Sequence, residues 1–243
     1  TYNVATALRQ PGSSGKPFIY ATGFTKGYTP GTLLMDVKTE YPAGDPTKPN
    51  ATYVPENYDG KYRGPLQLRF ALGNSINTVA VKMTALAGLR EIMTNGFNAG
   101  ISTWEPTDAN IRDVGLSLAL GGREVKLLEL TSAYGVFATG GVRNDPVAIL
   151  KVADNKGKTI FEYRPVSGRR VFSEEVSFLV SHILSDNNAR KDVFGEVNSL
   201  IISGHTVAAK TGTTDKKRDN WTLGYAQNRM GGVCVAAPDN TGM

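Results

Sequence analysis

The stretch Arg9-Gln10-Pro11-Gly12-Ser13-Ser14-Gly15-Lys16 contains a Pro-Gly pair and is followed by an apolar run. It indicates the fold more directly than any other segment. Pro-Gly marks a turn, and Phe18-Ile19-Tyr20 directly afterwards predict a buried helix. If that helix begins at or just after Gly12, Ser13 and Lys16 are three residues apart and share one helix face. The sequence therefore places a hydroxyl next to an amine.

Such a pair can act as a nucleophile and its base. A serine hydroxyl is a weak nucleophile near neutral pH and needs a base within hydrogen-bond reach. A lysine serves as that base when burial and nearby cations lower its pKa. The free N–H groups of a helix N-terminus can also stabilise a developing oxyanion. Ser-x-x-Lys occurs by chance in many chains, so it does not identify a function by itself, and the spacing of Ser14 gives that residue no role.

A second short motif, Ser75-Ile76-Asn77, falls at a predicted break in a helical region over residues 65–88, near Gly73-Asn74-Ser75. A Ser and an Asn two residues apart in a turn can point into one cleft. The hydroxyl can pass a proton there, and the amide can hold a substrate backbone. As a tripeptide it is also compatible with an ordinary cap between two helices.

The third motif is Lys210-Thr211-Gly212-Thr213, at the end of a strand predicted over residues 206–210. Glycine lets a ligand approach the backbone closely, and an ammonium with two hydroxyls can hold a carboxylate. The segment 204–211 nearly matches a phosphate loop. It has Ala209 where that loop needs glycine, however, and a charged turn with a Trp-led strand follows in place of a helix. A phosphate loop is therefore excluded.

Order and spacing make the three motifs specific together. Ser-x-x-Lys, then Ser-x-Asn about sixty residues later, then Lys-Thr-Gly is the set of active-site serine penicillin-binding proteins and their β-lactamase relatives. From about Asn3 to Tyr225 the chain resembles the transpeptidase domain of class A (bifunctional) penicillin-binding proteins. The stretches that carry the resemblance, besides 9–14, are 55–64 (Pro-Glu-Asn-Tyr-Asp-Gly-Lys-Tyr-Arg-Gly), 116–122, 130–138 and 209–214.

The resemblance implies a serine D-Ala-D-Ala transpeptidase. Ser13 would attack the penultimate D-alanine carbonyl of a peptidoglycan stem peptide, with Lys16 as base and Ser75 relaying a proton to the leaving amine. The backbone N–H groups of Ser13 and Thr213 would form the oxyanion hole. An amine of a neighbouring stem would then attack the acyl-enzyme and form the crosslink. The substrate-binding residues implied are Asn77 for the donor peptide, and Lys210, Thr211, Gly212 and Thr213 at the strand that engages its terminal carboxylate.

The implied partners are peptidoglycan stem peptides and β-lactam antibiotics, which would acylate Ser13 in the same way. No metal, no organic cofactor and no nucleic acid is implied. The same resemblance implies a place on the extracytoplasmic face of the bacterial plasma membrane, in the periplasm or on the cell-wall side. It also implies a full-length parent that carries a membrane anchor and a glycosyltransferase domain.

The fold class implied is α/β of the α+β type: a β-lactamase/transpeptidase-like antiparallel sheet of five strands, flanked by helices, with a helical subdomain. Two strands of that sheet precede the Ser-x-x-Lys helix in the family, yet only twelve residues precede Ser13 here. Residues 1–243 are therefore expected to be a partial domain, without its N-terminal strands and C-terminal helix and with exposed strand edges. Two features depart from the family: Gly15 replaces a bulky apolar residue, and 231–238 differs from the usual strand.

The remaining patterns give the predicted elements. Residues 28–64 are rich in Pro, Gly and Tyr and predict a long, ordered, Tyr-packed excursion over the surface. Ser173 is a predicted N-cap, followed by the apolar stripe of a helix. The other expectations are a helix over 125–139, a hairpin with strands 148–152 and 159–163, and strands at 206–210, 221–225 and 232–236.

Composition excludes several other classes. The chain has 243 residues, a net charge of +5, 40% hydrophobic and 20% charged residues, which is ordinary for a globular protein. Cys234 is alone and His182 and His205 are the only histidines, so a disulfide framework and a Cys- or His-rich metal site are not expected. The basic cluster 216–218 is interpreted as a solvated turn.

Two alternatives stay open at this point. A β-lactamase needs a general base that activates the deacylating water, and no Glu stands in a context that supplies one. A β-lactam sensor or a degenerate module would acylate, or only bind, without crosslinking. Rapid penicillin turnover would favour the first, and failure to release D-Ala would favour the second.

Overall fold

The computed structural model describes residues 3–42, 50–214 and 218–237, and Lys216 and Lys217 of the basic cluster lie outside this range. The helices are α1 (Lys16–Thr25), α2 (Leu68–Gly73), α3 (Asn77–Ala87), α4 (Leu89–Ala99), α5 (Asp108–Val114), α6 (Leu127–Ala138), α7 (Glu174–Ser185) and α8 (Asn187–Phe194), with 3-10 helices η1 (Gly12–Gly15), η2 (Ser102–Trp104) and η3 (Gly115–Leu120). The strands are β1 (Leu8–Arg9), β2 (Leu33–Asp36), β3 (Tyr41–Pro42), β4 (Thr52–Tyr53), β5 (Gly64–Gln67), β6 (Val125–Lys126), β7 (Val142–Arg143), β8 (Lys151–Ala153), β9 (Thr159–Glu162), β10 (Arg169–Arg170), β11 (Ala208–Thr213), β12 (Asp219–Ala226) and β13 (Arg229–Ala236).

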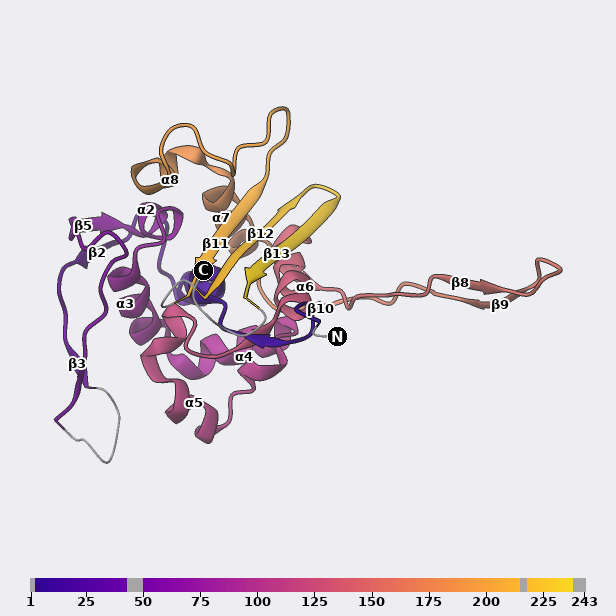
Figure 1. Ribbon diagram of the computed structural model, residues 1–243, viewed down its shortest axis with the longest axis horizontal. Coiled ribbons are helices and arrows are strands. Elements are labelled where there is room, and N and C mark those ends of the chain that lie inside the picture. The colour runs from indigo at the N-terminus through magenta and orange to yellow at the C-terminus, as the bar shows by residue number, and fades with distance from the viewer. Residues whose placement is uncertain (1–2, 43–49, 215–217, 238–243) are drawn as a thin grey trace.

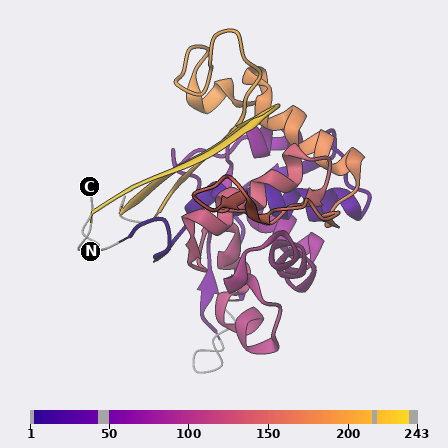
Figure 2. The same cartoon turned by 90° about the vertical axis from the view of Figure 1, so that its right-hand side faces the viewer.

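The main sheet is antiparallel, with strand order β11-β12-β13 (Figure 1). Seen edge-on it forms a thin layer over the helices (Figure 2), and α6 and α7 pack against it. The alternating burial of β12 fits a sheet with one covered face. The described part of this sheet has three strands. The five strands expected from the resemblance belong to the complete fold of the family. That residues 1–243 are a partial domain stays a prediction.

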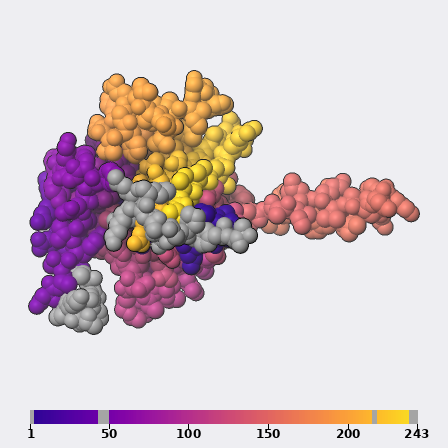
Figure 3. All heavy atoms as spheres, viewed as in Figure 1, coloured from indigo at the N-terminus to yellow at the C-terminus, as the bar shows by residue number. Residues whose placement is uncertain are grey.

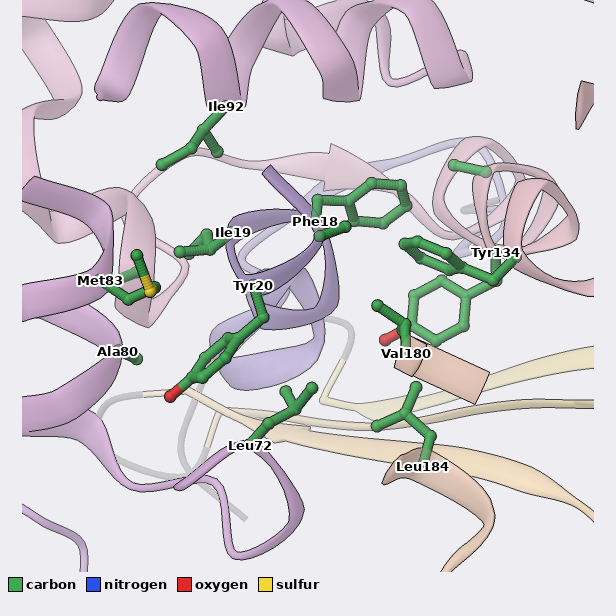
Figure 4. Packing of buried hydrophobic residues seen from close by; sticks show 14 of the residues in the cluster. Phe18, Ile19, Tyr20, Leu72, Ala80, Met83, Ile92, Tyr134, Val180 and Leu184 are labelled. Carbon is green, nitrogen blue, oxygen red and sulfur yellow. The ribbon is translucent and has the colours of Figure 1, made fainter. Parts of the chain in front are cut away.

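Helix α1 lies at the centre of the core. Every residue from Lys16 to Phe24 is buried, because the sequence is apolar around the whole helix. The Phe18 ring lies edge-on to Tyr134, with ring centroids 5.9 Å apart, and 5.0 Å from the Phe137 ring, so α1 is fastened to α6 (Figure 4). This packing fixes the orientation of Lys16 at the first turn of α1.

Most predicted elements are confirmed. Ser173 accepts a hydrogen bond from the Val176 backbone N–H and caps α7, and the helix predicted over 125–139 is α6. The helical region predicted from 65 begins later, at Leu68. Residues 65–67 instead form the end of β5, where Pro65 stands opposite Met35 of β2 in a two-stranded ribbon. Proline is tolerated there because a ribbon of two strands has outer edges that need no N–H donor.

Two segments extend away from the core. The excursion over 28–64 carries the pairs β2–β5 and β3–β4, and Tyr28, Tyr41 and Tyr53 pack partly against the core, as predicted. The predicted hairpin is the pair β8–β9, which projects from the body as a long arm (Figures 1 and 3). Its first strand begins at Lys151, and not at residue 148 as predicted. No helix among the described residues is long and apolar enough to cross a membrane.

Candidate active site

Ser13 stands on η1, a short turn that is held from several sides. Gly12 has φ +54°, a left-handed conformation that favours glycine, and it begins the turn. The Ser14 hydroxyl donates to the Pro11 carbonyl at 2.6 Å, and the Tyr134 hydroxyl donates to the Ser14 carbonyl at 2.6 Å. Ser14 is therefore a structural residue. Ser13 is half-buried while Ser14 is buried, so Ser13 is the hydroxyl that remains accessible.

The Lys-Thr-Gly strand packs directly on this turn through two glycines. A β-carbon built on Gly212 would lie 2.2 Å from the Pro11 carbonyl oxygen, and one built on Gly12 would lie 2.5 Å from the Thr213 carbonyl oxygen. Any side chain at either position would push η1 and β11 apart. The two glycines thus bring the backbones around Ser13 and Thr213 together, as an oxyanion hole requires.

Lys16 reaches from α1 to the second motif. Its Nζ donates to the Ser75 carbonyl at 2.7 Å and to Asn77 Oδ1 at 2.7 Å, and it lies 3.4 Å from the Ser75 hydroxyl. The amine is fully buried, so these polar groups replace its hydration. The first motif and the second therefore meet at Lys16.

Lys210 approaches the same serine from the third motif. Its Nζ donates to the Ser75 hydroxyl at 2.8 Å and to the Thr211 carbonyl at 2.8 Å. The Ser75 oxygen thus accepts from two lysines, which leaves its own proton available to a third group. Thr211 and Thr213 alternate with Lys210 along β11, and they stand on its less buried side.

The electrostatics of the site are those of buried cations. Burial, and then the charge of Lys210, lower the pKa of Lys16 well below its usual value. Burial, and then the charge of Arg190, lower the pKa of Lys210 to about 7. Among the described residues, no Asp or Glu forms an ion pair with Lys16, Lys210 or Arg190. An anion bound beside these groups would favour the protonated forms of Lys16 and Lys210, so the site is suited to an anionic ligand.

The turn that carries Ser75 is strained and held from both sides. Ser75 has φ +62°, the only positive φ of a non-glycine residue in the described chain. Such a conformation costs on the order of 1–3 kcal/mol and persists when surrounding contacts impose it. The neighbouring Asn74 supplies contacts of that kind: its amide donates to the Ala189 carbonyl at 3.1 Å and accepts from the Val193 N–H at 2.9 Å, both on α8.

The structure therefore brings together all three motifs singled out in the sequence. It also adds residues that the sequence motifs did not identify. Arg190 contributes charge from α8, and Asn57 and Asp36 contact the turn of the second motif from the excursion. Asn57 lies in the 55–64 stretch that carried the resemblance, but nothing in the local pattern indicated its role.

Residues 2–240 match the family model described as the penicillin-binding protein transpeptidase domain. This chain belongs to that family. It is 36% identical to penicillin-binding protein 1A of Aquifex aeolicus, over 94% of this chain and 29% of the relative. It is 32% identical to penicillin-binding protein 1A of Neisseria lactamica, over 93% of this chain and 27% of the relative. The chain thus spans less than a third of the length of these curated relatives.

Solved structures of this family show the same fold. Penicillin-binding protein 1A from Haemophilus influenzae superposes with a TM-score of 0.79 at 28% identity, over 98% of this chain and 40% of that chain. The penicillin-binding protein PonA1 from Mycobacterium tuberculosis superposes with a TM-score of 0.82 over 99% of this chain and 63% of that chain, and at 20% identity it is a match of fold alone. The predicted β-lactamase/transpeptidase-like fold of mixed helices and strands is confirmed.

Proposed function

We propose that this transpeptidase domain is a serine DD-transpeptidase that crosslinks peptidoglycan through an acyl-enzyme on Ser13. The observation that carries the proposal is the contact of two lysines from different motifs, Lys16 and Lys210, with one hydroxyl, that of Ser75. Two buried amines at one hydroxyl are a proton-transfer device when their pKa values are low. Neither Lys16 nor Lys210 forms an ion pair with a carboxylate of the described residues.

The proposed acylation step uses Ser13, Lys16 and Ser75. Neutral Lys16 takes the Ser13 proton as Oγ attacks the penultimate D-alanine carbonyl, and the backbone N–H groups of Ser13 and Thr213 stabilise the oxyanion. The Lys16 ammonium then passes a proton to the Ser75 oxygen, and the Ser75 proton goes to the nitrogen of the departing D-alanine. The peptide bond breaks, and an ester to Ser13 remains.

Transfer reverses this sequence. The amine of a neighbouring stem attacks the ester carbonyl, its surplus proton moves through Ser75 to Lys16 and back to Ser13, and an amide replaces the ester. Atoms and charges balance without a metal or an organic cofactor. A β-lactam presents the same carbonyl and carboxylate, so it would form an ester on Ser13 in the same way.

Substrate recognition uses Lys210, whose protonated amine attracts an anion. The terminal carboxylate of the donor would lie at the edge of β11, near Lys210, with the Thr211 and Thr213 hydroxyls as further partners. Asn77 already accepts from Lys16 and donates to the Glu56 carbonyl at 2.8 Å. Its amide keeps one lone pair and one hydrogen, which suffice to hold the backbone of a stem peptide.

The greater length of the relatives supports a larger parent protein. We propose a parent that is membrane-anchored and carries a glycosyltransferase domain, with the present chain on the extracytoplasmic side. Its partners there are the stem peptides of peptidoglycan and, as inhibitors, β-lactams.

A synthetic stem peptide ending in D-Ala-D-Ala, incubated with the chain and an excess of an acceptor amine, tests the proposal. Mass spectrometry should show D-alanine release matched by formation of the peptide–acceptor amide, with neither product formed by Ser13→Ala. Absence of both D-alanine release and an acyl-enzyme in the wild-type chain would contradict the proposal. Release of D-alanine to water alone, with fast penicillin turnover, would favour a hydrolase.

A further inference from the structure

Asn57 makes an unusually complete set of hydrogen bonds beneath the Ser75–Asn77 turn. Its Nδ2 donates to Asp36 Oδ1 at 2.7 Å and to the Lys61 carbonyl at 2.8 Å. Its Oδ1 accepts from the Asn77 backbone N–H at 2.9 Å and from the Thr78 backbone N–H at 3.2 Å. Both hydrogens and both lone pairs of the amide are therefore used, and Asn57 is almost fully buried.

The two N–H groups that Asn57 binds are the first of α3. Helix α3 has no cap from its own chain segment, because Ile76 stands at the N-cap position and offers no acceptor side chain. The first N–H groups of a helix need acceptors when they are buried. Asn57 supplies the missing acceptor from twenty residues earlier in the chain, so a cap that is usually local is here a tertiary contact.

A buried carboxylate fixes Asn57 in turn. Asp36 is fully buried and accepts from Asn57, from the Thr78 hydroxyl and, at 2.9 Å, from the Arg63 backbone N–H. The Arg63 guanidinium lies 3.7 Å from the same carboxylate and supplies the counter-charge. A carboxylate only accepts hydrogen bonds, so Asn57 presents its N–H₂ to Asp36 and its oxygen to α3.

We infer that Asn57, held by Asp36, is a positioning residue of the transferase site: it fixes the start of α3 so that Ser75 and Asn77 meet Lys16. This inference rests on the proposed function. Asn57 itself touches no reacting atom. Its effect passes through the backbone of Asn77, whose side chain accepts from Lys16, and through the strained Ser75 peptide, whose carbonyl accepts from the same amine.

The excursion over 28–64 therefore supports the start of α3. It delivers an acceptor and its supporting carboxylate to the site from two different points, β2 and the 55–64 stretch. An amide suits position 57, because the site uses two N–H hydrogens and both lone pairs of one oxygen. An aspartate could accept from α3 but would face Asp36 without a donor.

The test measures acylation of the chain by a fluorescent penicillin over a range of concentrations, well below the melting temperature. Asn57→Ala should lower the limiting acylation rate by at least about 10-fold, because misplacement of a catalytic group by about 1 Å reduces rates on this scale. The isosteric Asp36→Asn, which sets an N–H₂ against one of the donors, should lower it by about 3-fold or more. Thr84→Val is the matched control: it removes a buried hydrogen bond of α3, to the Ala80 carbonyl, far from the turn.

Hydrogen exchange supplies a readout that general destabilisation does not move. In Asn57→Ala the backbone amides of Asn77 and Thr78 should exchange about 10-fold faster or more, while later amides of α3 keep their protection. Thr84→Val should lower the melting temperature and leave the limiting acylation rate within about 2-fold of the wild type.

The outcomes separate the two claims. A wild-type limiting rate in both Asn57→Ala and Asp36→Asn would overturn the inference and leave the proposed function intact. An equal loss of rate in Thr84→Val and Asn57→Ala would also overturn it, since the effect would then follow stability alone. A wild-type chain that is not acylated at all would overturn the proposed function. If Asn57→Ala does not fold, the test uses Asp36→Asn alone. The limiting acylation rate of Asp36→Asn, and the hydrogen exchange of Asn77 and Thr78 in that variant, then decide whether the inference holds.

Discussion

The Trp104 ring occupies the space beside Gly15. A β-carbon built on Gly15 would lie 3.2 Å from Cζ2 of Trp104, and one built on Gly96, on another side of the ring, would lie 2.2 Å from Cε3. Trp104 is almost fully buried, and its ring stands edge-on to Phe18 at 6.0 Å. The Trp104 ring from η2 therefore fills the space beside position 15, and it leaves no room there for a bulky side chain.

Gly15→Phe should destabilise the protein by about 1–3 kcal/mol or more, because the new ring overlaps Trp104 and Gly96 prevents its retreat. Trp104→Ala alone should cost about 3–5 kcal/mol through the cavity it leaves. The double variant should cost less than the sum of the two, by at least about 0.5 kcal/mol. Urea unfolding of the four proteins measures this, and strict additivity would show that the two positions do not share the space.

Ser75→Ala should leave the fold intact and slow penicillin acylation by about 100-fold or more, since a positioned proton relay contributes on this scale. Lys16 and Lys210 would each lose the hydroxyl that joins them. Stopped-flow acylation at saturating penicillin is the measurement. A rate within a factor of about 3 of the wild type would remove Ser75 from the proton path.

Lys210 should make stability depend on pH. Its pKa is about 7 in the folded protein and near 10.5 when exposed, so between these values the unfolded chain binds more protons than the folded one. The free energy of unfolding should therefore rise with pH across this window, by at most about 1.4 kcal/mol per pH unit from this group. Urea unfolding at pH 7, 8 and 9 should show a steeper rise in the wild type than in Lys210→Met. Identical slopes would contradict a depressed pKa.

Asp219 contacts the residue that follows β11. It forms a buried ion pair with Arg9 at 3.3 Å, while the Thr214 backbone N–H donates to its carbonyl at 3.1 Å. Asp219→Ala would remove the carboxylate of this buried pair, and the expected destabilisation is about 1–3 kcal/mol. Calorimetric unfolding checks this, with the exposed Asp108→Ala as control. A loss below about 1 kcal/mol would mean that Arg9 is stabilised without Asp219.

Local patterns and the order of the motifs were enough to predict two helices and the fold class. The cap and the apolar stripes predicted α6 and α7, and the motif set predicted the fold. Both predictions are confirmed, because helix periodicity is local and because the motif set is specific to one fold. The structure brings Lys16 and Lys210 to one hydroxyl, that of Ser75, while the role of Ser13 stays a prediction.

Other parts of the site could not be predicted, because distant segments determine them. Trp104 fills the place beside Gly15 from far along the chain, and Asn57 caps α3 from a proline-rich excursion. The positive φ of Ser75 runs against the preference of serine, so it follows from tertiary contacts and not from local propensity. Residues 65–67 form a strand and not the predicted helix, because their pairing with β2 overrides local preference.

Intact-mass analysis after brief exposure to penicillin, followed by peptide mapping, tests the central claim most directly. The account predicts one covalent penicilloyl group per chain, mapped to Ser13, and an unmodified mass for Ser13→Ala under the same conditions. An adduct of undiminished yield on Ser13→Ala, or one mapped to another residue, would contradict the account.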